Sequence, residues 1–508
     1  MADPRQKIAI VQSKKDVLSE MNFGHRIAED EGDDLHAYFV ETDQWNRIFR
    51  GDVDVVYGAK GSGKSAIYSL LLKHAAELRR RGVNVVPAEN PRGTPVFANL
   101  VEDPPTTEQE FRGLWKLYFL CLIANNLRKS RVSSGPGLAV VQSVEQAGLL
   151  PADSSLRGML RLALDYVRNL LKAESIEGGI KLDPTTGMPA GVTGKITLRE
   201  PGTSQRAKGV NSADTLLKLA NDALTESGQE IWLLLDRLDV AFAESHELES
   251  NALRAVFRVY LDLMAFERIA LKIFLRTDIW RRITSEGFRE ASHITRHITL
   301  SWESSSLLNL VIRRAIHNEG IRRLYSVDPQ EVLRSTANQE ALFYKMFPRQ
   351  VDAGSRKPST FDWMLSRTCD GSKQTAPREL IHLLSCARDV QLKKLEIGQP
   401  EPPNGALFDR TALKEALPEV SKVRYEQTLC AEYPDLRDQL EKLKAEKTQQ
   451  TAKTLAKIWG VDKERALSAA ERLTEVGFFE KRTIASEPIF WVPFLYRDSL
   501  EMIQGPAE

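Results

Sequence analysis

The sequence predicts an α/β protein in which a parallel sheet is followed by a helical region and a small C-terminal module of helices and strands. Three observations predict this. A glycine-rich run, residues 58–65, lies between an apolar strand and an amphipathic helix. Further stretches of strand length alternate with helical stretches up to residue 300, which is typical of a parallel sheet. Near the C-terminus, two helices precede two strands.

The glycine-rich run matches the pattern G-x-x-x-x-G-K-[ST] at every fixed position. Residues 53–57 are mostly apolar and suit a buried strand, and residues 66–79 carry apolar side chains at helical spacing. Glycines let backbone N–H groups surround a phosphate, and the helix N-terminus adds partial positive charge. The context argues against a chance glycine turn and predicts a phosphate-binding loop. Its members are Gly58, Ala59, Lys60, Gly61, Ser62, Gly63, Lys64 and Ser65.

Two side chains of this loop are expected to contact the ligand. Lys64 would neutralise the β- and γ-phosphates of a nucleoside triphosphate, and the Ser65 hydroxyl would ligate Mg²⁺. Residues 231–235 are apolar and end at Asp236, the expected second Mg²⁺ partner. Asp239 follows and is the candidate for polarising the attacking water. Alternatively, Asp236 is a turn residue and Asp239 is a helix N-cap or an ion-pair partner.

Three more strands complete a predicted five-stranded sheet. The strand over residues 269–275 is followed by Thr277 and Asp278, which are candidates for sensing the γ-phosphate. Asp278 could instead cap a helix that begins at Ile279. The other two strands are residues 83–86 and 297–300.

The long interval between Lys64 and Asp236 predicts an insertion over residues 95–215. The favoured interpretation is that the insertion only packs against the core, as a family-specific addition to the fold. The alternative is a partner-binding element. The insertion is expected to contain helices over residues 111–127 and 156–173, and a hairpin or surface loop between residues 178 and 202.

Beyond residue 302 the chain is predicted to be helical. Pro377 suits the first turn of a helix that extends to about residue 394. Arg378 would project from the start of this helix, where a lid could place it on the γ-phosphate. The alternative is a surface arginine paired with an acid.

A linker rich in glycine and proline, residues 398–405, precedes the C-terminal module. Helices over residues 452–459 and 463–476, and strands over residues 478–482 and 489–493, form a winged-helix pattern. The second helix of such a module often reads DNA. Here its basic residues are balanced by acids, so protein contact or self-inhibition is favoured over DNA binding. These residues are Lys463, Arg465 and Arg472 against Glu464, Glu471 and Glu475.

Composition adds few constraints for the 508 residues. The 70 Lys and Arg residues nearly cancel the 69 Asp and Glu residues, so overall charge gives no sign of a nucleic-acid partner and leaves a local basic patch open. The four scattered cysteines are typical of reduced thiols. No signal peptide or membrane span is expected, since a span needs roughly twenty apolar residues. We therefore expect a soluble, cytoplasmic protein.

These parts, in this order, resemble the AAA+ and STAND P-loop ATPases, above all the origin-recognition and STAND-like branch. The resemblance implies an ATP- and Mg²⁺-dependent ATPase in which residues 58–65 are Walker A and Asp236 is the Walker B acid. It also implies Thr277 or Asp278 as first sensor and Arg378 as second. The N-terminal stretch of the chain is similar to bacterial P-loop ATPases of phage-defence neighbourhoods, at Phe23, Gly24, Ala28, Glu29, Tyr38, Phe39, Val40, Glu41 and Thr42.

Two departures from this pattern stand out. Arg237 follows Asp236 where a glutamate is usual, so the catalytic carboxylate must come from elsewhere or be missing. No arginine finger is identifiable by pattern; Arg296 is the best candidate and Arg289 the alternative. The implied domains are a lead-in over residues 1–50, an ATPase core over 51–304, a helical lid over 305–398 and a winged helix over 406–508.

Three functional hypotheses follow. The first is a nucleotide-driven switch, acting as a homo-oligomer or with a partner effector protein, in anti-phage defence by resemblance. The second is a DNA-acting ATPase, such as a loader, translocase or repair factor, that uses its winged helix. The third is a nucleotide-binding scaffold with negligible turnover, which Arg237 motivates.

Overall fold

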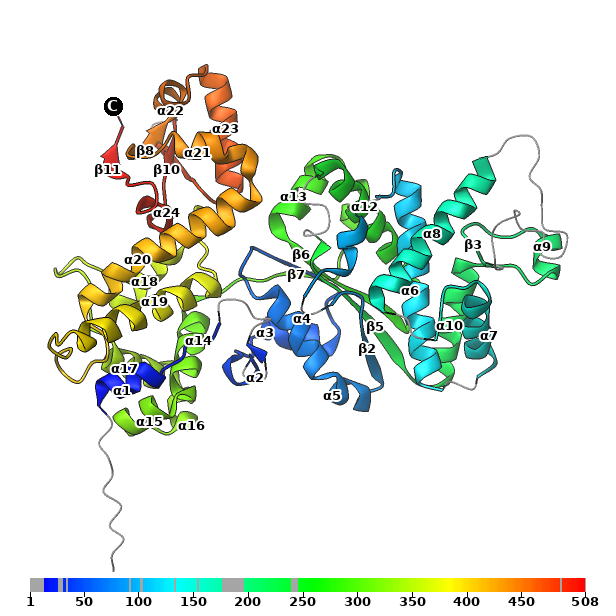
Figure 1. Ribbon diagram of the computed structural model, residues 1–508, viewed down its shortest axis with the longest axis horizontal. Helices are drawn as coiled ribbons and strands as arrows, with labels where there is room; N and C mark the ends of the chain where they lie inside the picture. The colour runs from blue at the N-terminus through cyan, green and yellow to red at the C-terminus, as the bar shows by residue number, and fades with distance from the viewer. Residues whose placement is uncertain are drawn as a thin grey trace, which may run out of the picture. The chain divides into compact units, whose positions relative to one another are not determined.

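A computed structural model describes residues 13–25, 31–32, 35–90, 93–100, 104–131, 134–152, 155–175, 196–238, 245–484 and 487–507. The chain forms two compact units (Figure 1). Unit 1 comprises Met1–Thr42, Ala59–Gly63 and Ser301–Glu508, and unit 2 comprises Asp43–Gly58 and Lys64–Leu300. No helix in the described part of the chain is long and apolar enough to cross a membrane.

Unit 2 is built on a parallel sheet whose five strands have the order β2-β5-β6-β1-β7 in the described residues. All the pairings between these neighbours are parallel, which confirms the predicted core. The carboxyl ends of all five strands therefore meet at one edge of the sheet, and the glycine-rich loop follows β1 there. The strands are β1 Val55–Gly58, β2 Val83–Pro87, β5 Glu230–Leu235, β6 Ile269–Arg276 and β7 His297–Thr299.

Helices cover both faces of this sheet. Alternate strand residues point to opposite faces, and each face packs its side chains against a different layer of helices. Leu233 and Ile273 belong to a large core shared with the helices of one layer. On the other face, the ring of Phe274 lies edge-on against Tyr68 of α4, 5.9 Å away between centroids. The helices of unit 2 include α4 Lys64–Lys73, α5 Ala75–Arg80, α6 Glu108–Lys129, α7 Gly135–Gln146, α8 Leu156–Ser175, α10 Ala213–Glu226, α12 His246–Leu263 and α13 Thr277–Ser285.

Two predicted helices differ from those in the structure, one by a break and the other by its first residue. The helix expected over residues 66–79 is interrupted at His74, whose backbone (φ −82°, ψ 10°) separates α4 from α5. The imidazole of His74 lies 2.9 Å from the carboxylate of Glu77 in α5. Helix α13 begins at Thr277 rather than Ile279, with Arg276 as its N-cap.

The predicted insertion packs as a helical group. Its two predicted helices are confirmed as α6 and α8, which pack against each other, and α6 also packs against α7 and α10 (Figure 1). Residues 178–195, which are most of the predicted hairpin or surface loop, lie outside the described residues. The described strand β3 Ile196–Thr197 pairs in parallel with β4 Asn211–Ser212, so this pair is not a hairpin.

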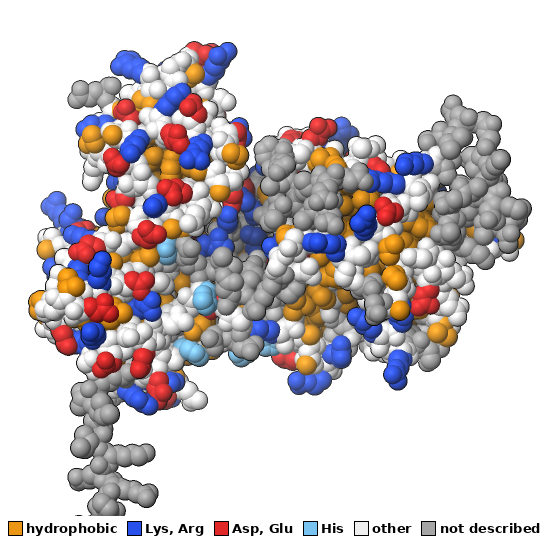
Figure 2. Space-filling model, in the orientation of Figure 1, with side chains coloured by type: hydrophobic (Ala, Val, Ile, Leu, Met, Phe, Trp, Pro, Cys, Tyr) orange, Lys and Arg blue, Asp and Glu red, His pale blue; other side chains and the backbone are white. Residues whose placement is uncertain are grey.

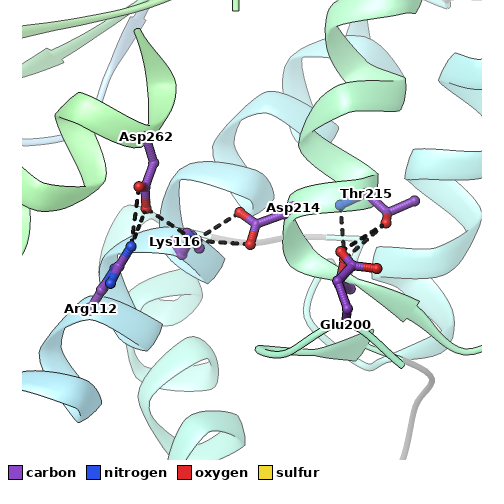
Figure 3. Close-up of polar contacts among 7 residues, drawn as sticks. Arg112, Lys116, Glu200, Asp214, Thr215 and Asp262 are labelled. Atoms are coloured by element: carbon purple, nitrogen blue, oxygen red, sulfur yellow. Dashed lines mark hydrogen bonds and ion pairs between the residues drawn. The ribbon is translucent and has the colours of Figure 1, made fainter. Parts of the chain in front are cut away.

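Charged side chains connect α6 of this group to α10 and α12 (Figure 3). Lys116 of α6 is buried, and its ammonium lies 2.8 Å from Asp214 of α10 and 3.1 Å from Asp262 of α12. Arg112 adds a second pair with Asp262 at 2.9 Å. The buried ammonium is compensated by two carboxylates, as a buried charge requires.

Unit 1 contains the helical region and the C-terminal module around one apolar core. The N-terminal helix α1 Lys14–Glu20 packs on α19 and α15. The predicted boundaries between lead-in, core, lid and winged helix stay predictions. The helices of the helical region include α14 Ser304–His317, α15 Glu319–Tyr325, α16 Pro329–Leu333, α17 Thr336–Met346, α18 Thr360–Thr368, α19 Pro377–Glu396 and α20 Arg410–Arg424.

The C-terminal module is a winged helix, as predicted. Helices α22 Ala452–Trp459 and α23 Lys463–Glu475 are followed by the antiparallel pair β9 Glu480–Ile484 and β10 Glu487–Trp491. The sheet has the order β11-β8-β10-β9 and includes two strands that were not predicted, β8 Lys447–Thr451 and β11 Ile503–Pro506.

Stacked arginines and aromatic rings join the winged helix to α18. The guanidinium of Arg367 lies 3.7 Å from the ring centre of Phe494, and that of Arg497 lies 3.8 Å from the same centre. Arg497 and Arg482 also lie 5.5 and 4.1 Å from the Trp491 ring. Burial and the neighbouring arginines lower the pKa of Arg497 to about 10. The ring faces therefore stabilise cations that would otherwise repel one another.

We expect Phe494→Leu to destabilise unit 1 by about 1–2 kcal/mol, because two cation–π contacts are lost while an apolar side chain remains. Thermal unfolding followed by tryptophan fluorescence measures the effect. Phe494→Tyr keeps the ring face and serves as the control. Equal destabilisation by both variants would contradict a role for the ring face.

Candidate nucleotide-binding site

The two ends of the glycine-rich loop lie at the carboxyl edge of the sheet in unit 2. Strand β1 ends at Gly58 and helix α4 begins at Lys64. The Lys64 ammonium donates a hydrogen bond to the Gly58 carbonyl oxygen, 2.9 Å away. This contact holds the positive charge across the loop, where the phosphates of a bound nucleotide would lie.

The two predicted Mg²⁺ ligands lie within hydrogen-bond distance of each other. The Ser65 hydroxyl donates to a carboxylate oxygen of Asp236 at 2.9 Å, although the residues are 171 positions apart. Asp236 is buried and follows β5 directly. The fold thus brings together the loop and the acid that the sequence predicted separately.

The oxygen atoms of this pair fit Mg²⁺, a hard cation that binds proteins through few carboxylates and completes its shell with phosphate and water. Ser65 and Asp236 would hold it together with the phosphates. Among the described residues, no group of three or more His, Cys, Asp or Glu side chains could hold a metal on its own.

The inner residues of the loop belong to unit 1. Gly61 and Gly63 have φ values of +81° and +100°, which glycine adopts without strain. Arg378 lies beside Gly61, because a Cβ atom added to Gly61 would be 3.0 Å from the Cβ of Arg378. The Trp302 indole N–H donates to the Ser62 carbonyl oxygen at 2.8 Å.

A second group of unit 1 residues meets this part of the loop. Lys60 forms an ion pair with Glu432, which follows the π-helical turn Tyr425–Cys430. Lys60 and Arg378 also line a cavity of about 290 Å³ together with residues of α19, α20 and that turn. Arg378 follows Pro377 in the first turn of α19, as predicted; its role as second sensor stays a prediction.

The first-sensor candidates lie at the start of α13, directly after β6. Asp278 accepts two hydrogen bonds from Arg276, at 3.1 and 2.7 Å. Because α13 already begins at Thr277, Asp278 does not cap a helix beginning at Ile279. Thr277 and Asp278 share the carboxyl edge with the loop, and their sensing role stays a prediction.

Arg296 lies at the opposite edge of the sheet, because it precedes β7. Its guanidinium lies 2.7 Å from the Asp54 carboxylate, just before β1. Arg289 is exposed, in the short 3-10 helix Arg289–His293. Neither arginine lies at the phosphate edge of its own unit, and the finger role stays a prediction for both.

The candidate for polarising water, Asp239, lies outside the described residues. Arg237, in the position where a glutamate is usual, has a φ of +60° and donates to the Gly93 carbonyl oxygen at 3.1 Å. The arginine therefore holds the loop that follows β2.

Glu89 is a buried carboxylate at the same edge that the sequence analysis missed. It is 0% exposed and accepts backbone N–H groups of Asn90 and Val96, both at 2.8 Å. Burial raises its pKa to about 7, although these hydrogen bonds and Arg237 act in the opposite direction. The signal that found Asp236, an acid just after an apolar strand, could also have found Glu89.

No known protein family matches the chain, and neither does a curated protein. Among solved structures, the ORC1 protein of Aeropyrum pernix in complex with DNA is 11% identical, over 94% of this chain and 96% of its own, with a TM-score of 0.36. The ORC2 protein of that organism, in ADPNP–ADP complexes, is 14% identical over 89% and 88%, with a TM-score of 0.38. The ADP form of that ORC2 protein is 12% identical, over 92% of this chain and 90% of its own, with a TM-score of 0.31. At these values the likeness assigns no family to the chain.

Proposed function

We propose that this chain binds ATP with Mg²⁺ and hydrolyses it. The observation that carries this is the contact between Ser65 and Asp236 at the carboxyl edge, beside the ammonium of Lys64. Phosphoryl transfer depends on positioning and charge neutralisation rather than on covalent chemistry with the protein. Lys64 would neutralise phosphate charge, while Mg²⁺ would offset the charge that develops on the phosphoryl oxygens.

The hydrolysis would serve a nucleotide-driven switch. Support comes from unit 1, where the inner loop contacts Arg378, Trp302 and Glu432. A ligand that binds the loop more tightly in one arrangement of these contacts would shift the population toward it. The partner would be an effector protein or a second copy of the chain. The place in anti-phage defence rests on sequence resemblance alone.

A DNA-acting ATPase is the alternative, supported by the winged helix. The charges on α23 count against it, since Arg465 pairs with Asp462 at 3.3 Å and Arg472 pairs with Asp435. Acidic and basic side chains are interspersed over the drawn face of the winged helix (Figure 2). Such a surface neutralises few DNA phosphates.

The deciding experiment measures ATP turnover by the purified full chain with and without duplex DNA, using Lys64→Ala as the blank. Turnover that DNA leaves unchanged supports the switch. Turnover that rises several-fold with DNA, and falls again with salt, supports the DNA-acting alternative. Turnover no higher than the blank under both conditions contradicts the ATPase and leaves the scaffold hypothesis.

A further inference from the structure

Glu89 and Asp236 occupy equivalent positions at the ends of two paired strands. In the parallel register of β2 and β5, Pro87 is paired with Leu234, and the Ala88 N–H donates to the Leu234 carbonyl oxygen at 2.8 Å. Glu89 lies two residues beyond Pro87, as Asp236 lies two beyond Leu234. The fold therefore places the Glu89 backbone beside that of the expected Mg²⁺ ligand.

The helix that follows the phosphate loop also fixes Glu89. Tyr68, in the second turn of α4, donates its hydroxyl hydrogen to the Glu89 carbonyl oxygen at 2.5 Å. Tyr68 is also buried, so this contact joins α4 to the end of β2 inside unit 2. Glu89 is thus fixed by the helix that begins with Lys64 and Ser65.

Arg237 and Glu89 both contact the connection that follows β2. Arg237 follows the Mg²⁺ acid and donates to Gly93, while Glu89 accepts from Asn90 and Val96 of the same connection. Arg237 is also electrostatically coupled to Glu89. The carboxylate expected beside Asp236 is therefore present at this edge, but it comes from β2.

We propose that Glu89 is the catalytic carboxylate that accepts the proton of the attacking water, an inference that rests on the proposed ATPase function. The water oxygen forms a bond to the γ-phosphorus, and the bond from that phosphorus to the β–γ bridging oxygen breaks. The departing electron pair leaves with ADP, and the water proton goes to a carboxylate oxygen of Glu89. In the free chain both carboxylate oxygens of Glu89 accept backbone N–H groups, from Asn90 and Val96, so the proposal requires that substrate binding free one of them for the water.

The alternative is a structural role, in which the carboxylate only holds the connection after β2. Glu89→Gln separates the two, because an amide oxygen still accepts the Asn90 and Val96 N–H groups. We expect its ATP turnover to fall by about 10²–10⁴-fold, the usual contribution of a general base. ATP affinity and the thermal midpoint are expected to stay close to those of the unchanged protein. In a single-turnover experiment with labelled ATP, the bound label should remain ATP.

Glu110→Gln is the matched control, since Glu110 is also a buried carboxylate of unit 2 that accepts a backbone N–H, from Thr106 at 2.6 Å. Glu110 lies at the start of α6, so this variant should keep its turnover. Glu89→Asp retains a carboxylate and should turn over faster than Glu89→Gln.

Three outcomes would overturn the inference. The first is normal turnover by Glu89→Gln. The second is loss of ATP affinity or of folding together with turnover, and the third is equal losses in the Gln and Asp variants. Failure of the proposed function is recognised separately, because the unchanged protein would then turn over no more ATP than Lys64→Ala.

Discussion

Replacing Lys64 with alanine is expected to lower ATP turnover by at least about 100-fold, the scale seen when one preorganised donor to a developing oxyanion is removed. The ammonium bridges the loop through the Gly58 carbonyl, so its loss removes the positive charge that would face the phosphates. ATP affinity should fall as well, because charge-assisted hydrogen bonds to phosphate are strong. Steady-state hydrolysis and calorimetric titration of ATP measure the two effects.

Lys73→Ala is the matched control, because Lys73 is an exposed lysine in the last turn of the same helix. It should leave both turnover and affinity unchanged. If Lys64→Ala bound and hydrolysed ATP like the unchanged protein, the nucleotide would have to bind away from residues 58–65. Equal losses in the two variants would indicate damage to α4 instead of loss of a phosphate contact.

Local pattern was sufficient to select the candidate residues that lie on the loop and directly after β5. The loop motif includes Lys64 and Ser65, and Asp236 follows a continuous apolar strand, so each is visible in a short window of sequence. The parallel sheet brings the carboxyl ends of β1 and β5 to one edge, and the strand order, with only β6 between them, allows the 2.9 Å contact between Ser65 and Asp236. Glu89 was missed because it lies beyond residues 83–86, the bounds of the predicted strand.

Other features depend on tertiary contacts that no short window contains. Strand β8 is polar throughout, yet Thr448 and Gln450 are both fully buried, because β10 and β11 pair on its two sides. The break at His74 is equally invisible in the apolar spacing, which continues through it. The partner of Arg296 could not be predicted either, since Asp54 lies 242 residues away and within a predicted strand that is mostly apolar.

Lys272 of β6 and Asp54, which directly precedes β1, form a buried ion pair in unit 2. Lys272 is 2% exposed in the middle of β6, and its ammonium lies 2.7 Å from the Asp54 carboxylate. Burial lowers the pKa of Lys272 in spite of this carboxylate. The ammonium also donates to the Val53 carbonyl oxygen at 2.8 Å and lies 4.4 Å from the centre of the Trp232 ring.

Asp54→Ala is expected to destabilise unit 2 by about 3–5 kcal/mol, because it leaves the Lys272 ammonium buried without a counter-charge. For a unit of this size, the thermal midpoint should fall on the order of 10 °C. Scanning calorimetry of the full chain, with limited proteolysis to identify the unit that unfolds, measures the shift.

Two further variants show whether the buried charge causes this loss. Arg296→Ala removes the partly exposed partner of Asp54 and should cost about 1 kcal/mol or less, as for other exposed pairs. The double variant Asp54→Leu with Lys272→Met removes both charges and should recover much of the stability, since apolar groups of similar volume can replace a buried pair. If Asp54→Ala were no worse than Arg296→Ala, Asp54 would be dispensable, and the backbone carbonyl groups and the Trp232 ring would suffice to hold the ammonium of Lys272.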